Sequence, residues 1–465
     1  MISNVTDQKL GNRMTEDVPP QDGPAVSSAW LAEQIAESSA AGIAAAIARL
    51  VRHGELAPQT RLPTVRALAP RLDVSPATVS AAWATLRKQR VVAGGGRQGT
   101  WVLGGLAVPR PARYENISRF WPDQTLNLSR AVPDPALLPS MTDAFVHALR
   151  DPEVHSYEVV SISNPLREAV GQTWPFKTDN WMCVNGGYEG LLLLMRTTVV
   201  PGEHVAIEEP ATPRLLDILD NVGARPVPVA TDAEGPIPAS LREALQHDPV
   251  AFVYEPRSSS HLGASVTPSR RDELAALLAG TDTLVVEDDG LGDLSSFDYH
   301  GVAEVLPDQS VLVRSYSKSH SPDLRLAVMA GAAEPIERVR VYRQFGSGWT
   351  SRLLQNALAW LLQDELSTST VATARTTYRE RREDLTGLLA ARGLEATGVD
   401  GLAVWIPVRS EHEALLVLAS HGIAVAGASA SWTKPGPPAI RIATGLPIPE
   451  PERVADAVAR AVQAR

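Results

Sequence analysis

Cysteine is almost absent from this chain of 465 residues, which contains only Cys183. A single cysteine excludes an intramolecular disulfide framework and fits a reducing cytoplasm. Long apolar runs are also lacking: the longest candidate, residues 191–200, is interrupted by Arg196, and a membrane-spanning helix needs roughly 18–20 residues. The first 24 residues have no basic start followed by an apolar core. We therefore expect no signal peptide and predict a disordered tail over residues 1–28.

Several catalytic signatures are missing as well. The ten histidines are scattered, without an H-E-x-x-H pattern or a Cys/His cluster, so we predict no metal site. The chain has neither the G-x-S-x-G turn of a serine hydrolase nor a Walker phosphate loop. Its 44% hydrophobic and 21% charged residues are ordinary for a globular protein. At roughly 100–200 residues per domain, the length predicts two to four domains.

Charge is distributed unevenly along the chain, which carries a formal net charge of −10. Residues 37–103 hold nine Lys or Arg against three acids, a local charge of +6, whereas the residues after 103 carry −13. A basic module on an acidic body indicates that the module meets a polyanion and that the body does not.

The basic module has the pattern of three short helices and a hairpin. Apolar residues recur at helical spacing over 42–52, and a second short helix is expected over 63–72. Ser75 is a natural N-cap for a third helix, with Pro76 at its first position. The apolar face of that helix is formed by Val79, Trp83 and Leu86. The stretch VVAGGGRQGTWVL predicts two strands around a glycine-rich turn, so we predict a winged helix-turn-helix over residues 29–103.

Residues 54–102 resemble the reading head of the GntR family, whose pattern runs approximately G-x-L-x-P-G-x-x-L-P-S-x-R-x-L-A, then S-R-x-T-V, then a G-T-F/Y-V wing. The resemblance implies that the helix starts and the wing contact double-stranded DNA. The residues it assigns to DNA are Arg61, Thr64, Arg66, Ser75, Ala77, Thr78, Arg97 and Gly99. Pro76 replaces the usual arginine and the Ala77 side chain reads no base edge, so the operator sequence stays open. A solvated basic face is the alternative, but the order of elements and the turn chemistry favour DNA.

A linker is predicted over residues 104–123, followed by a large domain over residues 124–465. Five apolar stretches in this domain alternate with helical segments: HVAIEEP, RPVPVAT, VAFVYEP, TLVVEDD and SVLVRSY. This rhythm predicts a mostly parallel sheet covered by helices. Ligands of such sheets bind beyond the carboxyl ends of the strands.

Two of these strand ends carry residues suited to a cofactor. Asp288 ends one strand, where a carboxylate can hold a pyridine nitrogen protonated, and Lys318 follows the next, where it can form a Schiff base with an aldehyde. Arg325 can bind a phosphate bidentately. The glycine-rich turn in VNGGYEG opens a helix whose free N–H groups favour a phosphate. Each feature alone has a plain structural explanation, such as a capped loop, but all four occur here in order.

That order resembles the fold-type I aminotransferases, which use pyridoxal 5'-phosphate (PLP). Joined to a GntR-like head, it resembles the MocR subfamily of transcriptional regulators. The resemblance implies an α/β fold: a winged helix-turn-helix plus an aminotransferase-like domain with a mostly parallel sheet and a smaller C-terminal α/β subdomain. The cofactor-binding residues it implies are Lys318, Asp288, Arg325, Ser315, Ser317, Gly186, Gly187, Tyr188 and Tyr157, the last often serving the partner subunit. Arg441 occupies the position that grips an effector or substrate α-carboxylate.

The sequence departs from the enzyme pattern at four cofactor contacts. Gly290 replaces the tyrosine that bonds the phenolic oxygen of PLP, Ser260 replaces an asparagine, and Thr212 replaces the aromatic that stacks on the ring. Gly187 and Tyr188 stand where the phosphate turn has Ser-Gln. Losing one such contact costs about 1–3 kcal/mol. The candidate substitutes are His261, His320 and Tyr188. The residues leave PLP binding open and disfavour productive transamination.

Three functions follow from these residues. The first is a DNA-binding regulator, not an enzyme, whose body senses PLP, a PLP–amino acid adduct or another small molecule. The alternatives are an aminotransferase with an accessory DNA-binding head and a ligand-independent dimeric repressor. We predict a homodimer, because the resemblance to fold-type I aminotransferases implies sites built between two subunits and because two reading heads suit a repeated operator.

Overall fold

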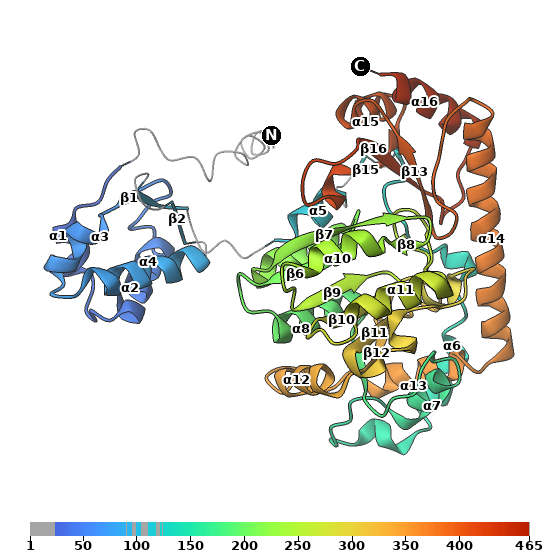
Figure 1. Ribbon diagram of the computed structural model, residues 1–465, viewed down its shortest axis with the longest axis horizontal. Coiled ribbons are helices and arrows are strands. Elements are labelled where there is room, and N and C mark those ends of the chain that lie inside the picture. The colour runs from blue at the N-terminus through green and yellow to red at the C-terminus, as the bar shows by residue number, and fades with distance from the viewer. Residues whose placement is uncertain are drawn as a thin grey trace, which may run out of the picture. The chain divides into compact units, whose positions relative to one another are not determined.

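The computed structural model describes residues 24–89, 91–94, 99–103, 110–117, 121–122 and 124–464. Within these residues the chain forms two compact units, divided in the sequence between Arg110 and Pro111 (Figure 1). Most of the predicted tail lies outside the described residues. From Pro24 onward the chain packs on the first unit: the Arg61 N–H donates to the Pro24 carbonyl at 2.7 Å.

The first unit has the predicted helices and wing. Its helices are α1 (Ser28–Glu33), α2 (Ala40–Arg52), α3 (Val65–Leu68) and α4 (Pro76–Lys88). Its sheet has the order β1-β3-β2, formed by β1 (Arg61–Leu62), β2 (Val92–Gly94) and β3 (Thr100–Val102). Ser75 caps α4 as predicted, because its hydroxyl accepts a hydrogen bond from the Thr78 N–H at 3.2 Å. The predicted apolar face of α4 is buried in the core of the unit. Helix α1 and strand β1 were not predicted.

The second unit is built on an eight-stranded sheet with the order β5-β12-β11-β10-β9-β6-β7-β8. The five apolar stretches form five of these strands, and they pair in parallel as predicted. The strands are β5 (Trp181–Val184), β6 (His204–Glu209), β7 (Arg225–Asp232), β8 (Gly235–Pro236), β9 (Ala251–Tyr254), β10 (Leu284–Asp289), β11 (Ser310–Ser315) and β12 (Ala327–Gly331). Strand β12 runs antiparallel to both β11 and β5.

Helices cover both faces of this sheet, and the strand residues alternate between the two. Val205 and Ile207 of β6 join one apolar core, whereas Ala206 joins another on the opposite face. Because both faces are buried, the strands read as continuous apolar runs. One face is covered by α8 (Gly187–Thr198), α9 (Pro213–Val222) and α12 (Ala333–Arg343). The other is covered by α6 (Thr142–Ala148), α7 (Asn164–Gly171), α10 (Pro238–Leu245), α11 (Pro268–Leu278) and α13 (Arg352–Leu361).

The predicted C-terminal α/β subdomain is present. Helix α14 (Glu365–Ala390) runs along the side of the second unit toward it (Figure 1). Its sheet has the order β13-β16-β15, and a separate parallel pair joins β14 to β4 near the start of the unit. The elements are β4 (Leu126–Asn127), β13 (Ala403–Pro407), α15 (Glu411–Ser420), β14 (Ile423–Ala424), β15 (Ala426–Gly427), β16 (Ala439–Ala443) and α16 (Pro451–Gln463).

One helix lies inside the segment that was expected to be a linker. Helix α5 (Ala112–Ile117) belongs to the second compact unit and packs on α9. The Asp217 carboxylate on α9 accepts hydrogen bonds from the N–H groups of Arg113 and Tyr114, at 3.2 and 3.0 Å. The second unit therefore begins before residue 124, the predicted start of the large domain, because α5 already packs on it. No helix among the described residues is long and apolar enough to cross a bilayer.

Candidate ligand site

The carboxyl ends of β9, β10 and β11 open on a cavity of about 290 Å³. Binding pockets for small organic ligands begin at about this size. The structure brings most of the predicted cofactor residues together there: Lys318, Asp288, Arg325, Ser315, Ser317, Gly187, Tyr188 and Arg441 all line it. They come from distant parts of the sequence, because parallel strands end at one edge of the sheet.

One corner of the cavity has the features of a phosphate site. Gly186 has a φ of +97° and turns the chain into α8, whose first residues Gly187 and Tyr188 line the cavity. The N–H groups in the first turn of a helix favour a phosphate. A side chain at Gly186 would crowd Arg325, since its Cβ would lie 3.0 Å from the guanidinium Nη2. The Ser317 hydroxyl is buried and has no hydrogen-bond partner among the described residues. Arg325 itself has a φ of +50°, a strained value for a residue with a side chain.

Asp288 and its neighbour Asp289 have opposite electrostatic environments. Asp289 is fully buried and accepts hydrogen bonds from Arg257 at 2.8–2.9 Å and from Arg314 at 2.7 Å. Although burial raises its pKa, these two guanidinium groups lower the pKa to about 2. Asp288 has no such partner: burial and the nearby Glu255 carboxylate raise its pKa to about 8, against the opposing charge of Lys318. Asp289 therefore forms structural ion pairs, and of these two neighbouring residues only Asp288 lines the cavity.

Glu255 is a cavity residue that the sequence analysis missed. It follows β9, and its two carboxylate oxygens accept hydrogen bonds from the Ser260 N–H and hydroxyl, both at 2.6 Å. Ser260, which stands where the enzymes have asparagine, is therefore bonded to Glu255. A Cβ at Gly290, where the enzymes have tyrosine, would lie 3.8 Å from Glu255 Oε1 and 3.5 Å from Asp288 Oδ1. The space around the two altered positions is thus bordered by carboxyl groups. The sequence feature that could have identified Glu255 is its place directly after a buried strand, at the same edge of the sheet as Asp288.

A third carboxyl group lies behind Glu255. The Glu255 N–H donates to Glu208 Oε1 at 3.0 Å, and Glu208 stands near the end of the adjacent strand β6. Burial and the charge of Glu255 raise the pKa of Glu208 well above its usual range, and burial also raises that of Glu255. We infer that protons are shared among these acids, because three buried carboxylates so close together would repel one another.

Arg441 reaches the cavity from β16. Its Nη2 donates to the Ser129 carbonyl at 2.9 Å, while its Nε is buried without a hydrogen-bond partner in the described chain. A buried, unpaired guanidinium N–H is costly, and a carboxylate can accept from it. This arrangement fits the predicted carboxylate grip.

The wall that lacks a stacking aromatic is formed by Thr212, Pro213 and Arg214. The Thr212 hydroxyl caps α9 by accepting a hydrogen bond from the Leu215 N–H at 3.4 Å. The Arg214 guanidinium lies 3.9 Å from the ring centre of Tyr114 and 4.8 Å from that of Tyr188. Sequence reasoning missed Arg214 and Tyr114 because neither occurs in a recognisable motif.

The two histidines considered as substitutes have other partners. His261 lines the cavity, where its Nε2 is 2.9 Å from the Ser431 hydroxyl, and burial lowers its pKa to about 3, so the ring is neutral. The His320 Nδ1 is 2.9 Å from the Ser319 hydroxyl, and His320 does not line the cavity.

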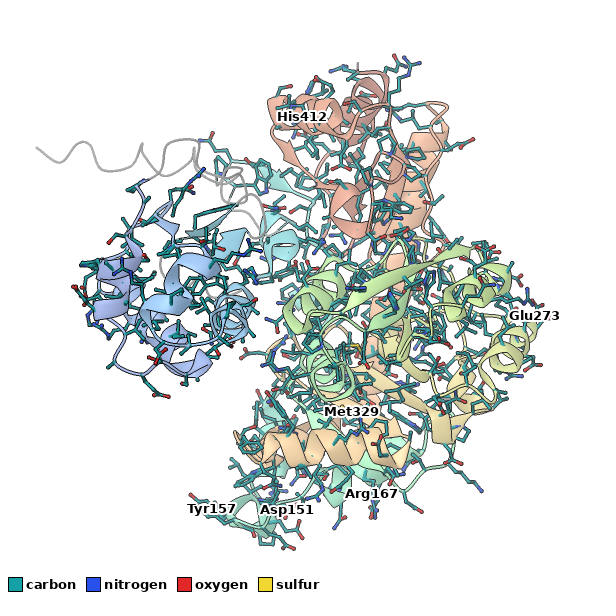
Figure 2. All side chains as sticks on the ribbon, turned by 60° about the vertical axis from the view of Figure 1, so that its left-hand side comes forward. Asp151, Tyr157, Arg167, Glu273, Met329 and His412 are labelled. Carbon is teal, nitrogen blue, oxygen red and sulfur yellow. The ribbon has the colours of Figure 1, made fainter. Side chains whose placement is uncertain are left out.

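Tyr157 is the predicted cofactor residue that lies elsewhere. It is 90% exposed and stacks edge-on against Trp349, with ring centres 6.1 Å apart. Figure 2 shows it at the outer edge of the second unit. The resemblance assigns this tyrosine to the site of a partner subunit, and its position at the edge leaves it available for that role.

The predicted DNA-binding residues gather at the starts of two helices in the first unit. Thr64 caps α3 and Ser75 caps α4, and Arg66 and Ala77 are exposed in the first turns that follow. The Thr78 hydroxyl lies 3.0 Å from that of Ser75. Arg61 pairs with Trp101 in the wing sheet, and Gly99 leads into β3 with a φ of +79°. Arg97 lies outside the described residues.

Comparison with known proteins gives two family matches on this chain. Residues 123–458 match the model described as aminotransferase class I and II, and residues 39–102 match that of the bacterial regulatory proteins of the gntR family. The vitamin B6 salvage pathway transcriptional repressor PtsJ of Salmonella typhimurium is 29% identical over 367 residues, covering 78% of this chain and 83% of the relative. The HTH-type pyridoxine biosynthesis transcriptional regulator PdxR of Corynebacterium glutamicum is 28% identical, covering 83% and 87%.

Solved structures support the fold of the second unit. A kynurenine aminotransferase from Pyrococcus horikoshii superposes with a TM-score of 0.68 at 19% sequence identity, covering 76% of this chain and 94% of that one. At this identity the likeness shows the aminotransferase fold and carries no argument about the reaction.

Proposed function

Because this chain belongs to the aminotransferase class I and II family over residues 123–458 and joins that domain to a GntR-type reading head, we propose that it is a PLP-sensing transcriptional regulator and not an enzyme. In this proposal the head binds operator DNA in the cytoplasm and the cavity binds PLP or a PLP–amino acid adduct. Two relatives that span most of the chain are named as transcriptional regulators of vitamin B6 pathways, which supports both the class of function and the class of ligand.

The cavity supports this proposal through one observation: its lining includes two buried polar groups, the Ser317 hydroxyl and the Arg441 Nε, that have no hydrogen-bond partner among the described residues. In this proposal Lys318 would bind the aldehyde covalently, and Asp288, near the end of the neighbouring strand, would hold the ring nitrogen. The unpaired Ser317 hydroxyl, the α8 N–H groups and Arg325 suit a phosphate. Arg441 Nε suits a carboxylate. When bound, PLP supplies an electron-accepting ring and a reactive aldehyde.

Binding and catalysis make different demands on these residues. Lys318, Asp288, Arg325 and Arg441 provide the contacts that hold a ligand. Gly290 and Thr212 lack the side chains that hold the ring in place for reaction, and Glu255 puts a carboxyl group beside the altered positions. Catalysis needs reacting groups held to within fractions of an ångström, whereas sensing needs only a difference in affinity between two states. We therefore assign this site to sensing.

A homodimer is part of the proposal. The aminotransferase-like fold, the exposed Tyr157 and the predicted pairing of two reading heads on a repeated operator support it. Light scattering at micromolar concentration should give twice the chain mass of 49.8 kDa, and a monomer would contradict the proposal.

The test uses the purified full chain mixed with PLP. We expect a saturable visible absorbance band of lysine-bound PLP, and after borohydride reduction the label should map to Lys318. A Lys318→Ala variant should lose the band. Incubation with amino acids and keto acids should give no turnover. Rapid transamination would favour the aminotransferase alternative, and the absence of any PLP binding would favour the ligand-independent repressor.

A further inference from the structure

The cavity has a wall that neither family domain supplies. Tyr114 and Ile117 of α5 line it together with the aminotransferase-like residues. The gntR match ends at residue 102 and the aminotransferase match begins at 123, so α5 lies in the segment between them. Because that segment leads directly to the DNA-binding unit, its presence in a ligand cavity calls for a physical explanation.

Helix α5 is held against the cavity by specific contacts to α9. The buried Asp217 carboxylate, whose side chain is 7% exposed, accepts hydrogen bonds from the N–H groups of Arg113 and Tyr114 and lies 3.6 Å from the Arg113 guanidinium. Arg113 also pairs with the exposed Asp220. A buried carboxylate satisfied by N–H groups of another segment loses those partners when the segment leaves, so α5 has a defined docked state.

The docked helix places an aromatic ring at the wall where one is missing. Thr212 stands where the enzymes have the aromatic residue that stacks on the cofactor. Arg214, two residues further on, lies over the ring of Tyr114. The Arg214 guanidinium also lies 4.8 Å from the ring centre of Tyr188. Tyr114, Arg214 and Tyr188 therefore lie together at that wall, and Tyr114 comes from the linker segment.

From this geometry we propose that α5 completes the ligand pocket and that Tyr114 contacts the bound ligand. The inference rests on the proposed function, with PLP or its adduct as the ligand. Since Tyr114 lines the pocket only when α5 is docked, the ligand binds the docked form better, and binding must in turn stabilise docking. Occupancy of the cavity is thereby linked to the conformation of the segment that joins it to the DNA-binding unit.

The first test measures PLP affinity by absorbance titration of the full chain. Tyr114→Ala should weaken binding roughly three- to tenfold, the usual effect of losing one aromatic contact. Tyr114→Phe should bind like the wild type. Tyr342→Ala, which removes a partly exposed tyrosine on α12 outside this cavity, is the matched control and should have no effect. Equal affinity of the Tyr114→Ala protein and the wild type would overturn the inference.

The second test measures docking itself, using trypsin cleavage after Arg113 followed by mass spectrometry. Saturating PLP should slow cleavage at this bond several-fold in the wild type. Asp217→Ala removes a docking contact outside the cavity lining, so it should speed cleavage and weaken PLP binding together, whereas Asp220→Ala should do less. A cleavage rate that PLP does not change would overturn the inference even if Lys318 binds PLP. Failure of the wild type to bind PLP at all would instead refute the proposed ligand, and the inference with it.

Discussion

Glu255 places a second buried carboxyl group beside Asp288 in the cavity. Its carboxylate raises the pKa of Asp288, and its hydrogen bonds occupy Ser260. A carboxylate this close disfavours both the ionised form of Asp288 and the phenolate oxygen of PLP. The amide of Glu255→Gln keeps the shape, removes the charge and can donate a hydrogen bond.

The Glu255→Gln variant should therefore bind PLP more tightly than the wild type, by roughly tenfold at pH 8. Absorbance titrations between pH 6 and 9 measure this affinity, and the gain should be larger at higher pH, where Glu255 of the wild type carries more negative charge. Glu234→Gln, a change at an exposed glutamate remote from the cavity, is the control. Weaker PLP binding by Glu255→Gln would show that Glu255 is a favourable ligand contact.

Asp288 lowers the stability of the folded chain, but we expect it to strengthen the binding of PLP. Its pKa is about 8 in the folded chain against 3.8 as its ordinary value, so the folded state holds a proton that the unfolded state releases. This group therefore destabilises the folded chain progressively as pH rises from about 4 toward 8.

Asp288→Asn removes this pH-dependent cost. The free energy of unfolding of the ligand-free variant should exceed that of the wild type by about 1 kcal/mol at pH 8, and the difference should be smaller at pH 5. Denaturant unfolding at the two pH values measures it. The same variant should bind PLP more weakly, because the partner of the ring nitrogen is lost. A stability difference independent of pH would contradict the raised pKa.

At the scale of elements, the sequence predicted most of what local patterns encode. The strands β6, β7, β9, β10 and β11 could be recognised because both faces are buried, and α4 because Ser75 and Pro76 mark its start. Asp288 and Lys318 were found for the same reason, since Asp288 lies near the end of β10 and Lys318 follows β11. Strand β1 has only two residues and α5 only six, too few for a periodic signal. The contacts of Arg214, Tyr114 and Glu255 depend on tertiary packing, which no local pattern reveals.

The turn into α8 gives a prediction that separates backbone strain from ligand binding. Gly186 and Gly202 have similar φ values, +97° and +101°, but only at Gly186 does an added Cβ meet a neighbour, Arg325. Both Gly186→Ala and Gly202→Ala should lose about 1–2 kcal/mol of stability, because the left-handed region disfavours a side chain. Only Gly186→Ala should also weaken PLP binding, measured by titration. Equal PLP affinity of the two variants would exclude a phosphate corner at this turn.

The helix starts in the first unit give a prediction about DNA. Arg66 is exposed in the first turn of α3, whereas Arg52 is exposed at the end of α2. Arg66→Ala should weaken DNA binding and reduce the slope of log affinity against log salt by about 1, as expected for the loss of one phosphate contact. Fluorescence anisotropy over a salt series measures this slope. Arg52→Ala should leave it unchanged, and equal slopes for Arg66→Ala and the wild type would remove Arg66 from the interface.

At the scale of the whole molecule, the charge asymmetry and the two family matches both indicate that the basic unit contacts DNA and that the acidic body binds the ligand. The basic unit carries the exposed helix starts, and the acidic body carries a cavity rich in arginine and lysine side chains. Repulsion between the acidic body and DNA favours contact through the head alone. The chain then needs a connection between the two functions, and α5 is the described element that touches the cavity and precedes the aminotransferase match.

The central claim is that PLP bound in this cavity changes the affinity of the protein for DNA. The most direct measurement is the affinity for a duplex selected from a random-sequence library, determined by anisotropy with and without PLP at fixed salt. The wild type should change its affinity about fivefold or more when PLP is added. Lys318→Ala should bind the same duplex and respond little to PLP. A wild type that carries PLP on Lys318 and binds the duplex with unchanged affinity would contradict the claim.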